Sequence, residues 1–236
     1  MNKFLNMNLW KNDSELFQLA KKELFVALVG DVMDKMGLLH QFLPQQIKPL
    51  NSEMVVIGRA MPVLEADVFS EKLEGTANPI MAKPFGLMFE ALDSLKKDEV
   101  YICSGGSYNY AMWGGLMSTR ATNLEAAGAV VNGFSRDTNE ILRLDYPTFS
   151  GGTYAQDQGP RGKVIDYGIP IEFGGILVNP GDVVYGDRDG VLIVPAERVE
   201  EAFSLALEKA RGEKSVQIAL ENGMSTVEAF ETFGIM

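Results

Sequence analysis

The stretch over residues 114–140, GGLMSTRATNLEAAGAVVNGFSRDTNE, constrains the fold most, because it combines a helix, a buried strand and an Arg-Asp pair. Two glycines precede a predicted helix over residues 116–127, and Gly128 stands where a left-handed C-terminal cap is usual. The apolar residues 129–131 then predict a short buried strand. This order indicates an α/β or an α+β chain, and in α/β sheets ligand sites gather at the carboxyl ends of strands.

Arg136 and Asp137 follow the predicted strand, and their chemistry suits one kind of ligand. Arginine presents a rigid fork of donors that fits a carboxylate, and aspartate is a hard oxygen ligand for Mg²⁺ or Mn²⁺. Free backbone N–H groups after Gly114 and Gly115 would face an anion. Together these groups predict a site for a chelating 2-oxo acid. An ordinary solvated or capping pair is the alternative, since Arg-Asp neighbours are common.

Further segments share their residues and order with one family. They are VGDVMDKMG (29–37), VIGRAMPV (56–63), FGGILVNPGDVVYGDRDGVLIVP (173–195) and the closing MSTVEAFETFGIM. Over about residues 25–236 the chain resembles the RraA-like family, which contains regulators of ribonuclease E activity and divalent-metal pyruvate aldolases. In the aldolases 20 residues separate a glycine from Arg-Asp, and an acid follows after two more residues. Here Gly115, Arg136-Asp137 and Glu140 hold these positions.

The resemblance implies the architecture. It implies an α/β fold, a layered α/β/α sandwich with a central mixed sheet (the RraA-like swivelling-domain fold), with N- and C-terminal helices. We expect one RraA-like domain over residues 1–236, with a helical extension at 1–30 and a helical tail at 196–236. The family also implies a homo-oligomer, a trimer or a hexamer.

The resemblance also assigns roles to the residues of the core motif. Arg136 and Asp137 would be catalytic: Arg136 would hold the substrate's carboxylate, and Asp137 would ligate Mg²⁺ or Mn²⁺. The backbone amides of Gly114, Gly115, Leu116 and Met117 would bind the pyruvyl end of the substrate.

Two other acids are candidates for supporting the metal. Glu140 fits a role beside the metal's ligands. In this family an acid of the C-terminal tail can complete the metal shell of a neighbouring subunit, and Glu213 is the position we expect, with Glu208 as an alternative.

These roles imply a metal-dependent lyase that cleaves a 4-hydroxy-2-oxo acid, of the 4-hydroxy-4-methyl-2-oxoglutarate type, to pyruvate, with oxaloacetate decarboxylation as a related activity. A Schiff-base route is disfavoured, because residues 104–135 contain no lysine. One departure concerns Gly115, where many of the aldolases carry an acid. A non-catalytic, protein-binding regulator and a lyase of shifted specificity are therefore the alternatives.

Composition limits the partners. The net charge of −11, without clustered Lys or Arg, argues against a nucleic-acid partner. The sequence contains no run near the ~18–20 apolar residues that span a bilayer, and its N-terminus lacks the apolar segment of a signal peptide, so we expect no membrane partner and a cytoplasmic location. The single cysteine, Cys103, excludes an internal disulfide.

Several other polar residues are candidates for function. Cys103 is expected to end a strand rather than act as a nucleophile, and His40, the single histidine, is expected at a loop or helix end. Asp187 and Asp189 suit a turn better than a metal site. Within the loop expected over residues 147–163, Tyr154, Asp157 and Arg161 either line a cleft or, as we expect, face solvent or another subunit.

Periodicity and turn signals predict the remaining elements. Helices are expected over residues 14–28, 31–36, 79–95 and 197–211, and strands over 54–63 (interrupted by Gly58), 99–103, 176–178, 183–185 and 191–194.

Overall fold

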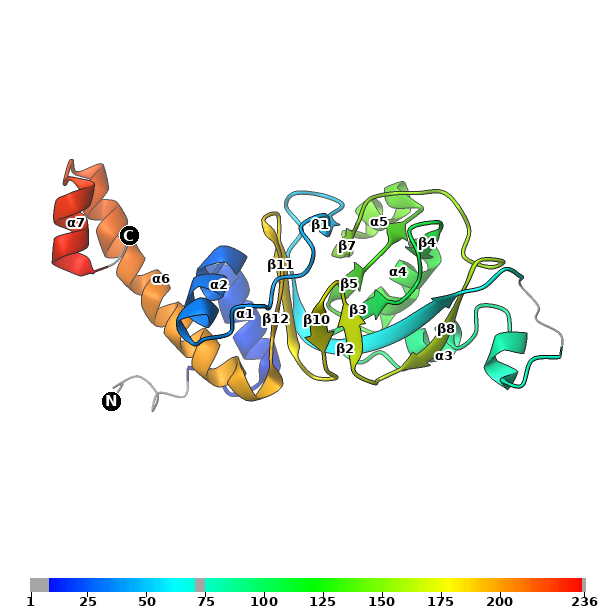
Figure 1. Ribbon diagram of the computed structural model, residues 1–236. Helices are drawn as coiled ribbons and strands as arrows, with labels where there is room; N and C mark the ends of the chain where they lie inside the picture. The colour runs from blue at the N-terminus through cyan, green and yellow to red at the C-terminus, as the bar shows by residue number, and fades with distance from the viewer. Residues whose placement is uncertain (1–8, 71–74, 235–236) are drawn as a thin grey trace. The chain divides into compact units, whose positions relative to one another are not determined.

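A mixed sheet organises residues 40–196, the larger of two compact units in the chain. The computed structural model describes residues 9–70 and 75–234. The long strand β2 (Val56–Asp67) is an interior strand of the order β1-β7-β5-β3-β2-β11-β12, and β8 also pairs with β2 (Figure 1). The other strands of the sheet are β1 (Lys48–Pro49), β3 (Glu99–Ser104), β5 (Gly128–Val131), β7 (Thr148–Ser150), β8 (Gly162–Tyr167), β11 (Val183–Asp187) and β12 (Gly190–Val194).

Strand directions make the sheet mixed. Strands β2, β3, β5 and β7 run parallel to one another, whereas β1, β8, β11 and β12 pair antiparallel with their neighbours. The predicted α/β fold with a central mixed sheet is therefore confirmed.

Alternate residues of the central strands point to opposite faces of the sheet. On one face they pack against α3 (Met88–Asp93), α4 (Gly115–Asn123) and α5 (Thr138–Leu144). On the other face they pack against the hairpin of β9 (Ile171–Phe173) and β10 (Ile176–Val178), together with Leu43 and Ile47. The helical face carries the predicted site, because α4 and α5 flank the core motif.

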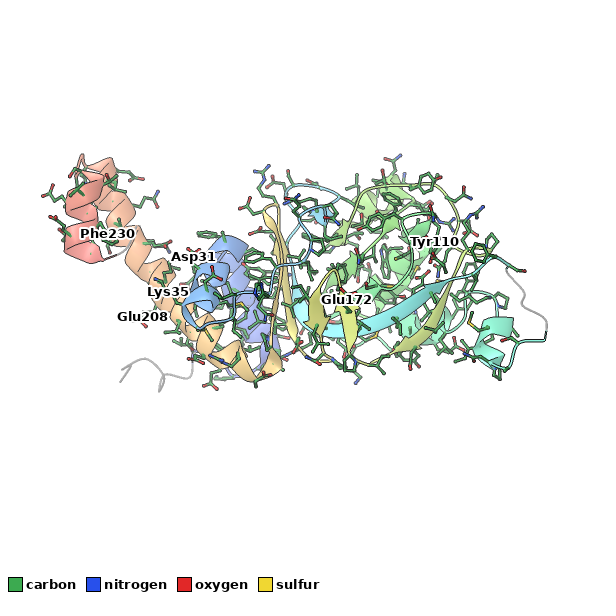
Figure 2. All side chains as sticks on the ribbon, viewed as in Figure 1. Asp31, Lys35, Tyr110, Glu172, Glu208 and Phe230 are labelled. Carbon is green, nitrogen blue, oxygen red and sulfur yellow. The ribbon has the colours of Figure 1, made fainter. Side chains whose placement is uncertain are left out.

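The smaller unit is helical and comes from both ends of the chain. It contains α1 (Asp13–Glu23), α2 (Val26–Lys35), α6 (Val199–Glu221) and α7 (Thr226–Phe233), and a 3-10 turn (Ala196–Arg198) precedes α6. On α6, Lys209 Nζ lies 2.5 Å from Oδ2 of Asp31 on α2, which is labelled in Figure 2. The predicted division into one domain with extensions at 1–30 and 196–236 stays a prediction.

Three predicted helices of these segments differ in their bounds. The helix predicted over residues 14–28 is wrong, because Leu24 and Phe25 adopt extended backbone and separate α1 from α2. The short helix expected at 31–36 is the second half of α2. The C-terminal helix continues ten residues beyond the predicted end, to Glu221.

Elements near the core motif also differ from prediction. Residues 79–95 form a 3-10 turn (Pro79–Ala82) and α3 rather than one helix, since Phe85 and Gly86 take positive φ. The helix predicted to reach Ala127 ends at Asn123, and Gly128 begins β5 instead of capping the helix. A β-carbon at Gly128 would lie 2.6 Å from the Val56 side chain, so close packing explains this glycine.

Two further expectations are corrected by the sheet. β2 is continuous through Gly58, where a β-carbon would overlap the carbonyl oxygen of Asp98. The segment 147–163, expected as a loop, contains β7 and the first residues of β8. In both places long-range strand pairing decides the conformation, and local composition does not reveal it.

Candidate functional site

Two short parallel strands bring the core motif together. β4 (Ala111–Trp113) pairs with β6 (Phe134–Ser135), and α4 begins directly after β4 as α5 does after β6. The backbone N–H of Arg136 donates to the carbonyl oxygen of Trp113 at 2.9 Å. The starts of the two helices therefore meet, and the glycine loop lies next to the Arg-Asp pair.

Asp137 is fixed by its backbone and by a hydrogen bond. It precedes α5 in the left-handed conformation, with φ of 58°, which most residues other than glycine avoid and which aspartate tolerates better. Its Oδ2 accepts a hydrogen bond from the backbone N–H of Gly115 at 3.1 Å. The carboxylate is thus held at the N-terminus of α4, where the helix dipole favours negative charge.

The two glycines make room for carboxylates. A β-carbon at Gly114 would lie 2.9 Å from Oδ2 of Asp137, and a β-carbon at Gly115 would overlap Oε2 of Glu140. Glu140 therefore fills the space beside Gly115, from the first turn of α5. The sequence lacks an acid at position 115, but the structure supplies a carboxylate at that place from position 140.

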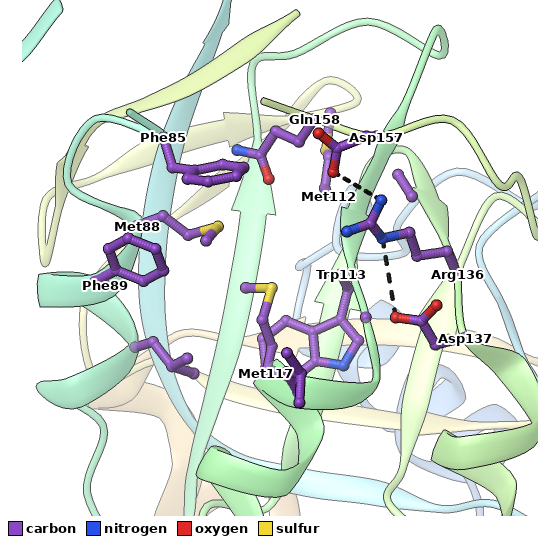
Figure 3. A pocket seen from close by; sticks show the side chains of 14 residues that line it. Phe85, Met88, Phe89, Met112, Trp113, Met117, Arg136, Asp137, Asp157 and Gln158 are labelled. Atoms are coloured by element: carbon purple, nitrogen blue, oxygen red, sulfur yellow. Dashed lines mark ion pairs between the residues drawn. The ribbon is translucent and has the colours of Figure 1, made fainter. Parts of the chain in front are cut away.

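The guanidinium group of Arg136 lies between two carboxylates (Figure 3). Nη1 forms an ion pair with Oδ1 of Asp157 at 2.7 Å, and Nε lies 3.9 Å from Oδ2 of Asp137. Figure 3 shows the remaining nitrogen of the fork directed toward the cavity beside it. Asp157 is itself oriented, because its Oδ2 accepts from the backbone N–H of Gly159 at 3.0 Å.

Asp157 lies at the cleft, one of the two positions considered for it, and its side chain is also 43% exposed; a contact with another subunit stays a prediction. Asp157 lines the cavity and contacts Arg136. The physical reason is that the backbone N–H of Ala111, on β4, donates to the carbonyl oxygen of Gln156 at 2.9 Å and fastens the segment over the site. No local pattern in a segment rich in Gly, Gln and Pro signals this contact.

A cavity of about 300 Å³ opens beside Arg136. Most of its wall is apolar: Phe85, Met88, Phe89, Leu92, Ala111, Met112, Trp113, Leu116 and Met117. Its polar side chains are Arg136, Asp137, Asp157 and Gln158 (Figure 3). Gln158 is only 4% exposed, and its Nε2 has no hydrogen-bond partner in the described part of the chain. Sequence reasoning did not identify Gln158.

Another polar group is buried at β2 and β3. Glu65 is 2% exposed, and its Oε2 accepts from Sγ of Cys103 at 3.6 Å. Burial raises the pKa of Glu65 to about 8, although hydrogen bonds from Tyr110 and Cys103 act in the opposite direction. Burial is also the main cause that raises the pKa of the Cys103 thiol, and the negative charge of Glu65 raises it further. Reactive cysteines have lowered pKa values, so the surroundings of Cys103 fit a structural residue rather than a nucleophile.

The other candidate residues belong to other parts of the sequence. Glu213, on α6 of the helical unit, has Oε1 3.4 Å from Nζ of Lys209. Asp187 and Asp189 form the turn between β11 and β12, where Oδ1 of Asp187 accepts from the backbone N–H of Asp189 at 2.8 Å. His40 lies outside helices and strands. The turn expected at Asp187 and the loop position expected for His40 are confirmed.

Asp137 and Glu140 are the residues of this site that fit a divalent metal. Both carboxylates border Gly115, which lacks the β-carbon that would displace Glu140. In the described residues no three or more His, Cys, Asp or Glu side chains gather as a metal site. Mg²⁺ is commonly bound through one or two carboxylates, with waters and substrate as further ligands. The donor set of this site therefore suits a hard cation shared with a substrate.

Comparisons with known proteins agree with the fold. A sequence model of the RraA-like family, described as Aldolase/RraA, matches residues 26–193. A solved structure of Streptomyces coelicolor RraAS2, described as an unusual member of the RNase ES inhibitor RraA protein family, has a TM-score of 0.72. It is 23% identical and covers 88% of this chain and 98% of its own. At that identity it shows the fold alone.

Two curated relatives match most of the chain. A Halalkalibacterium halodurans protein named "Putative 4-hydroxy-4-methyl-2-oxoglutarate aldolase" is 28% identical over 86% of this chain and 87% of its own length. Protein DlpA of Legionella pneumophila is 27% identical over 88% of this chain. The match spans only 32% of the length of DlpA.

For the described residues, no helix has the length and apolar character needed to cross a membrane. The predicted cytoplasmic location and the predicted absence of nucleic-acid and membrane partners stay predictions.

Proposed function

The chain belongs to the RraA-like family, and we propose that it is a divalent-metal-dependent lyase that cleaves a 4-hydroxy-2-oxo acid to pyruvate by a retro-aldol reaction. The relative named for 4-hydroxy-4-methyl-2-oxoglutarate makes that acid the first substrate to assay. Oxaloacetate decarboxylation is expected as a second activity, because it forms the same pyruvate enolate. The observation that carries the proposal is the meeting of Arg136, Asp137 and Glu140 at the glycine loop.

Each residue has a physical role in this proposal. Arg136 would receive the substrate's carboxylate, and Asp157 would keep the guanidinium group oriented through its 2.7 Å ion pair. The backbone amides of Gly114, Leu116 and Met117 would donate to the oxygens of the pyruvyl end, whereas the expected contact from Gly115 is replaced by its hydrogen bond to Oδ2 of Asp137. Asp137 and Glu140 would hold Mg²⁺ or Mn²⁺, which when bound supplies a Lewis acid for the 2-keto oxygen.

The bond changes follow from these roles. The C3–C4 bond breaks, its electron pair forms the enolate of pyruvate, the 4-hydroxyl loses its proton, and C4 becomes a carbonyl carbon. A proton at C3 then completes pyruvate. Donors fixed before the reaction stabilise the enolate oxygen without reorganisation, and the amides of α4 are fixed in this way by the helix itself.

Pyruvate release tests the proposal. Oxaloacetate and 4-hydroxy-4-methyl-2-oxoglutarate are each incubated with the protein and Mg²⁺ or Mn²⁺, and again with EDTA. We expect metal-dependent pyruvate above the free-metal background, and its loss in Asp137→Ala. Circular dichroism should show that Asp137→Ala is folded. Equal turnover by this variant would place the chemistry elsewhere.

A protein-binding regulator is a second candidate function. Its support is the fold likeness to RraAS2, whose description names RNase ES inhibition. A folded protein without pyruvate formation on either substrate, but with inhibition of RNA cleavage by ribonuclease E, would favour this candidate. For both functions we propose a homotrimer or homohexamer, which light scattering can measure.

A further inference from the structure

The cavity beside Arg136 is poorly suited to a second carboxylate. In the described lining, Arg136 is the one cationic side chain, whereas Asp137 and Asp157 are both acids. One arm of the Arg136 fork already binds Asp157 at 2.7 Å. A substrate with carboxylates at both ends would place one of them in an apolar wall beside two acids, without a cation to pair with it.

The wall beyond Arg136 suits an apolar group. It is formed by Phe85, Met88, Phe89 and Leu92 around α3, and by Met112 and Met117 around α4 (Figure 3). Methionine side chains adapt to irregular shapes and make favourable contacts with aromatic rings. The volume of about 300 Å³ is at the lower end of the range for small-ligand pockets. Such a wall stabilises a ring or a branched alkyl group.

Gln158, a residue of the cavity lining, has a buried donor that lacks a partner within the described structure. Gln158 is only 4% exposed, and its Nε2 has no hydrogen-bond partner in the described residues. A buried amide of this kind is destabilising unless a ligand accepts from it. A hydroxyl or carbonyl oxygen can accept this hydrogen bond, and it carries no charge that Asp157 would repel.

We infer that the natural substrate is a monocarboxylate: a 4-hydroxy-2-oxo acid whose distal half is an aryl or branched alkyl group, with its C4 oxygen near Gln158. This inference rests on the proposed function and narrows its substrate class, so oxaloacetate and 4-hydroxy-4-methyl-2-oxoglutarate, which carry two carboxylates, are expected to be turned over only as poor substrates. Cleavage converts the substrate R–CH(OH)–CH₂–CO–COO⁻ into R–CHO and pyruvate. The hydroxyl proton is released, C3 takes up one proton, and no oxidant or reductant is needed.

Binding of two matched analogues tests the inference without turnover. 2-Oxo-4-phenylbutanoate and 2-oxoglutarate share the 2-oxo acid head, and they differ in a distal phenyl or carboxylate group. Neither has a 4-hydroxyl, so neither undergoes retro-aldol cleavage. Fluorescence of Trp113, which lines the cavity, can report binding in a Trp10→Phe background, with Mg²⁺ present. We expect the phenyl analogue to bind at least about tenfold more tightly.

A charge inserted into the wall should reverse this preference. Phe89 is 55% exposed and lines the cavity, so Phe89→Arg should fold while offering a cation to the distal carboxylate. Leu177→Arg, at a 62% exposed leucine outside the cavity lining, is the matched control. We expect 2-oxoglutarate to bind more tightly to Phe89→Arg than to the parent, and Leu177→Arg to behave like the parent.

Failure of the inference can be told from failure of the proposed function. Metal-dependent exchange of the pyruvate methyl protons in D₂O reports enolisation and needs no distal group. Exchange together with equal or tighter binding of 2-oxoglutarate to the parent would overturn the inference alone, as would no saturable binding of the phenyl analogue at millimolar concentration. Preferential binding of the phenyl analogue without exchange would support the cavity's specificity and reject the lyase.

Discussion

The free energy of unfolding of this protein should fall as the pH rises, and replacing Glu65 with glutamine should abolish that fall. The Glu65 side chain is 2% exposed, and its Oε1 has no hydrogen-bond partner in the described structure. Burial disfavours the charged form, so the pKa of Glu65 rises from 4.5 to about 8. The native state therefore retains a proton that the unfolded chain releases above its own pKa.

The sign and size of the effect follow from this difference. Between the two pKa values the native state binds more protons than the unfolded state, so the free energy of unfolding falls as the pH rises. The stabilisation is fully present below the unfolded pKa and lost as the pH rises to the folded pKa. The full effect is about 5 kcal/mol, of which about 3.5 kcal/mol is lost between about pH 5 and about pH 8. Glutamine does not titrate, so the Glu65→Gln variant shows no such pH-dependent loss of stability.

Urea unfolding measures this loss. In a Trp10→Phe background, fluorescence comes from Trp113, which lies in the same compact unit as Glu65. The difference in unfolding free energy between parent and Glu65→Gln should change by about 3.5 kcal/mol between the two pH values, in favour of the variant at high pH. Glu53→Gln, at an exposed position, controls for the loss of one acid. Parallel pH profiles of parent and Glu65→Gln would refute the reasoning.

Three other changes probe the site and the sheet. Arg136→Lys should weaken binding of oxalate, a planar mimic of the pyruvate enolate, by about tenfold or more, because lysine lacks the bidentate fork; equal oxalate affinities by calorimetry would contradict this role. Gly115→Ala should displace Glu140 and lower Mn²⁺ affinity, measured by electron paramagnetic resonance, and adding Glu140→Ala should then cost little further. Gly58→Ala should destabilise the protein by about 1–3 kcal/mol in urea, since its β-carbon would overlap the carbonyl oxygen of Asp98; an unchanged urea midpoint would argue against that close approach.

The elements that the sequence predicted well are those with strong local signals. β10, β11 and β12 were expected within two residues of their bounds, because short apolar runs between PGD and DRDG turns leave few alternatives. The juxtaposition of Gly115 with Asp137 was also expected, from a spacing shared with a family. Where such signals are missing, the sequence predicts one helix in place of two elements, as over residues 14–28 and 79–95. The breaks at Phe25 and Phe85 depend on tertiary packing, which the local sequence does not specify.

The features that place Asp157 and Gln158 at the cavity were not predictable from the sequence. Asp157 and Gln158 reach the cavity because β8 pairs with β2 and because the segment is fastened to β4. Both contacts join residues far apart in the chain, and neither produces a periodic pattern in the sequence. The same holds for Glu65, whose burial depends on the packing of β2 and β3 rather than on its sequence neighbours.

The twenty-residue spacing in the core motif has a geometric cause. After β4 the chain must form α4, cross the sheet as β5 and return beside β4 as β6, so that the loop before α4 meets the loop before α5. The spacing therefore secures one contact, that of Asp137 with the N-terminus of α4. It does not determine which acids surround that contact. A carboxylate beside Gly115 is equally well supplied by Glu140, three residues after Asp137 on α5, since residues at this separation share a helix face. An acid missing at position 115 is thus weak evidence that the chemistry has been lost.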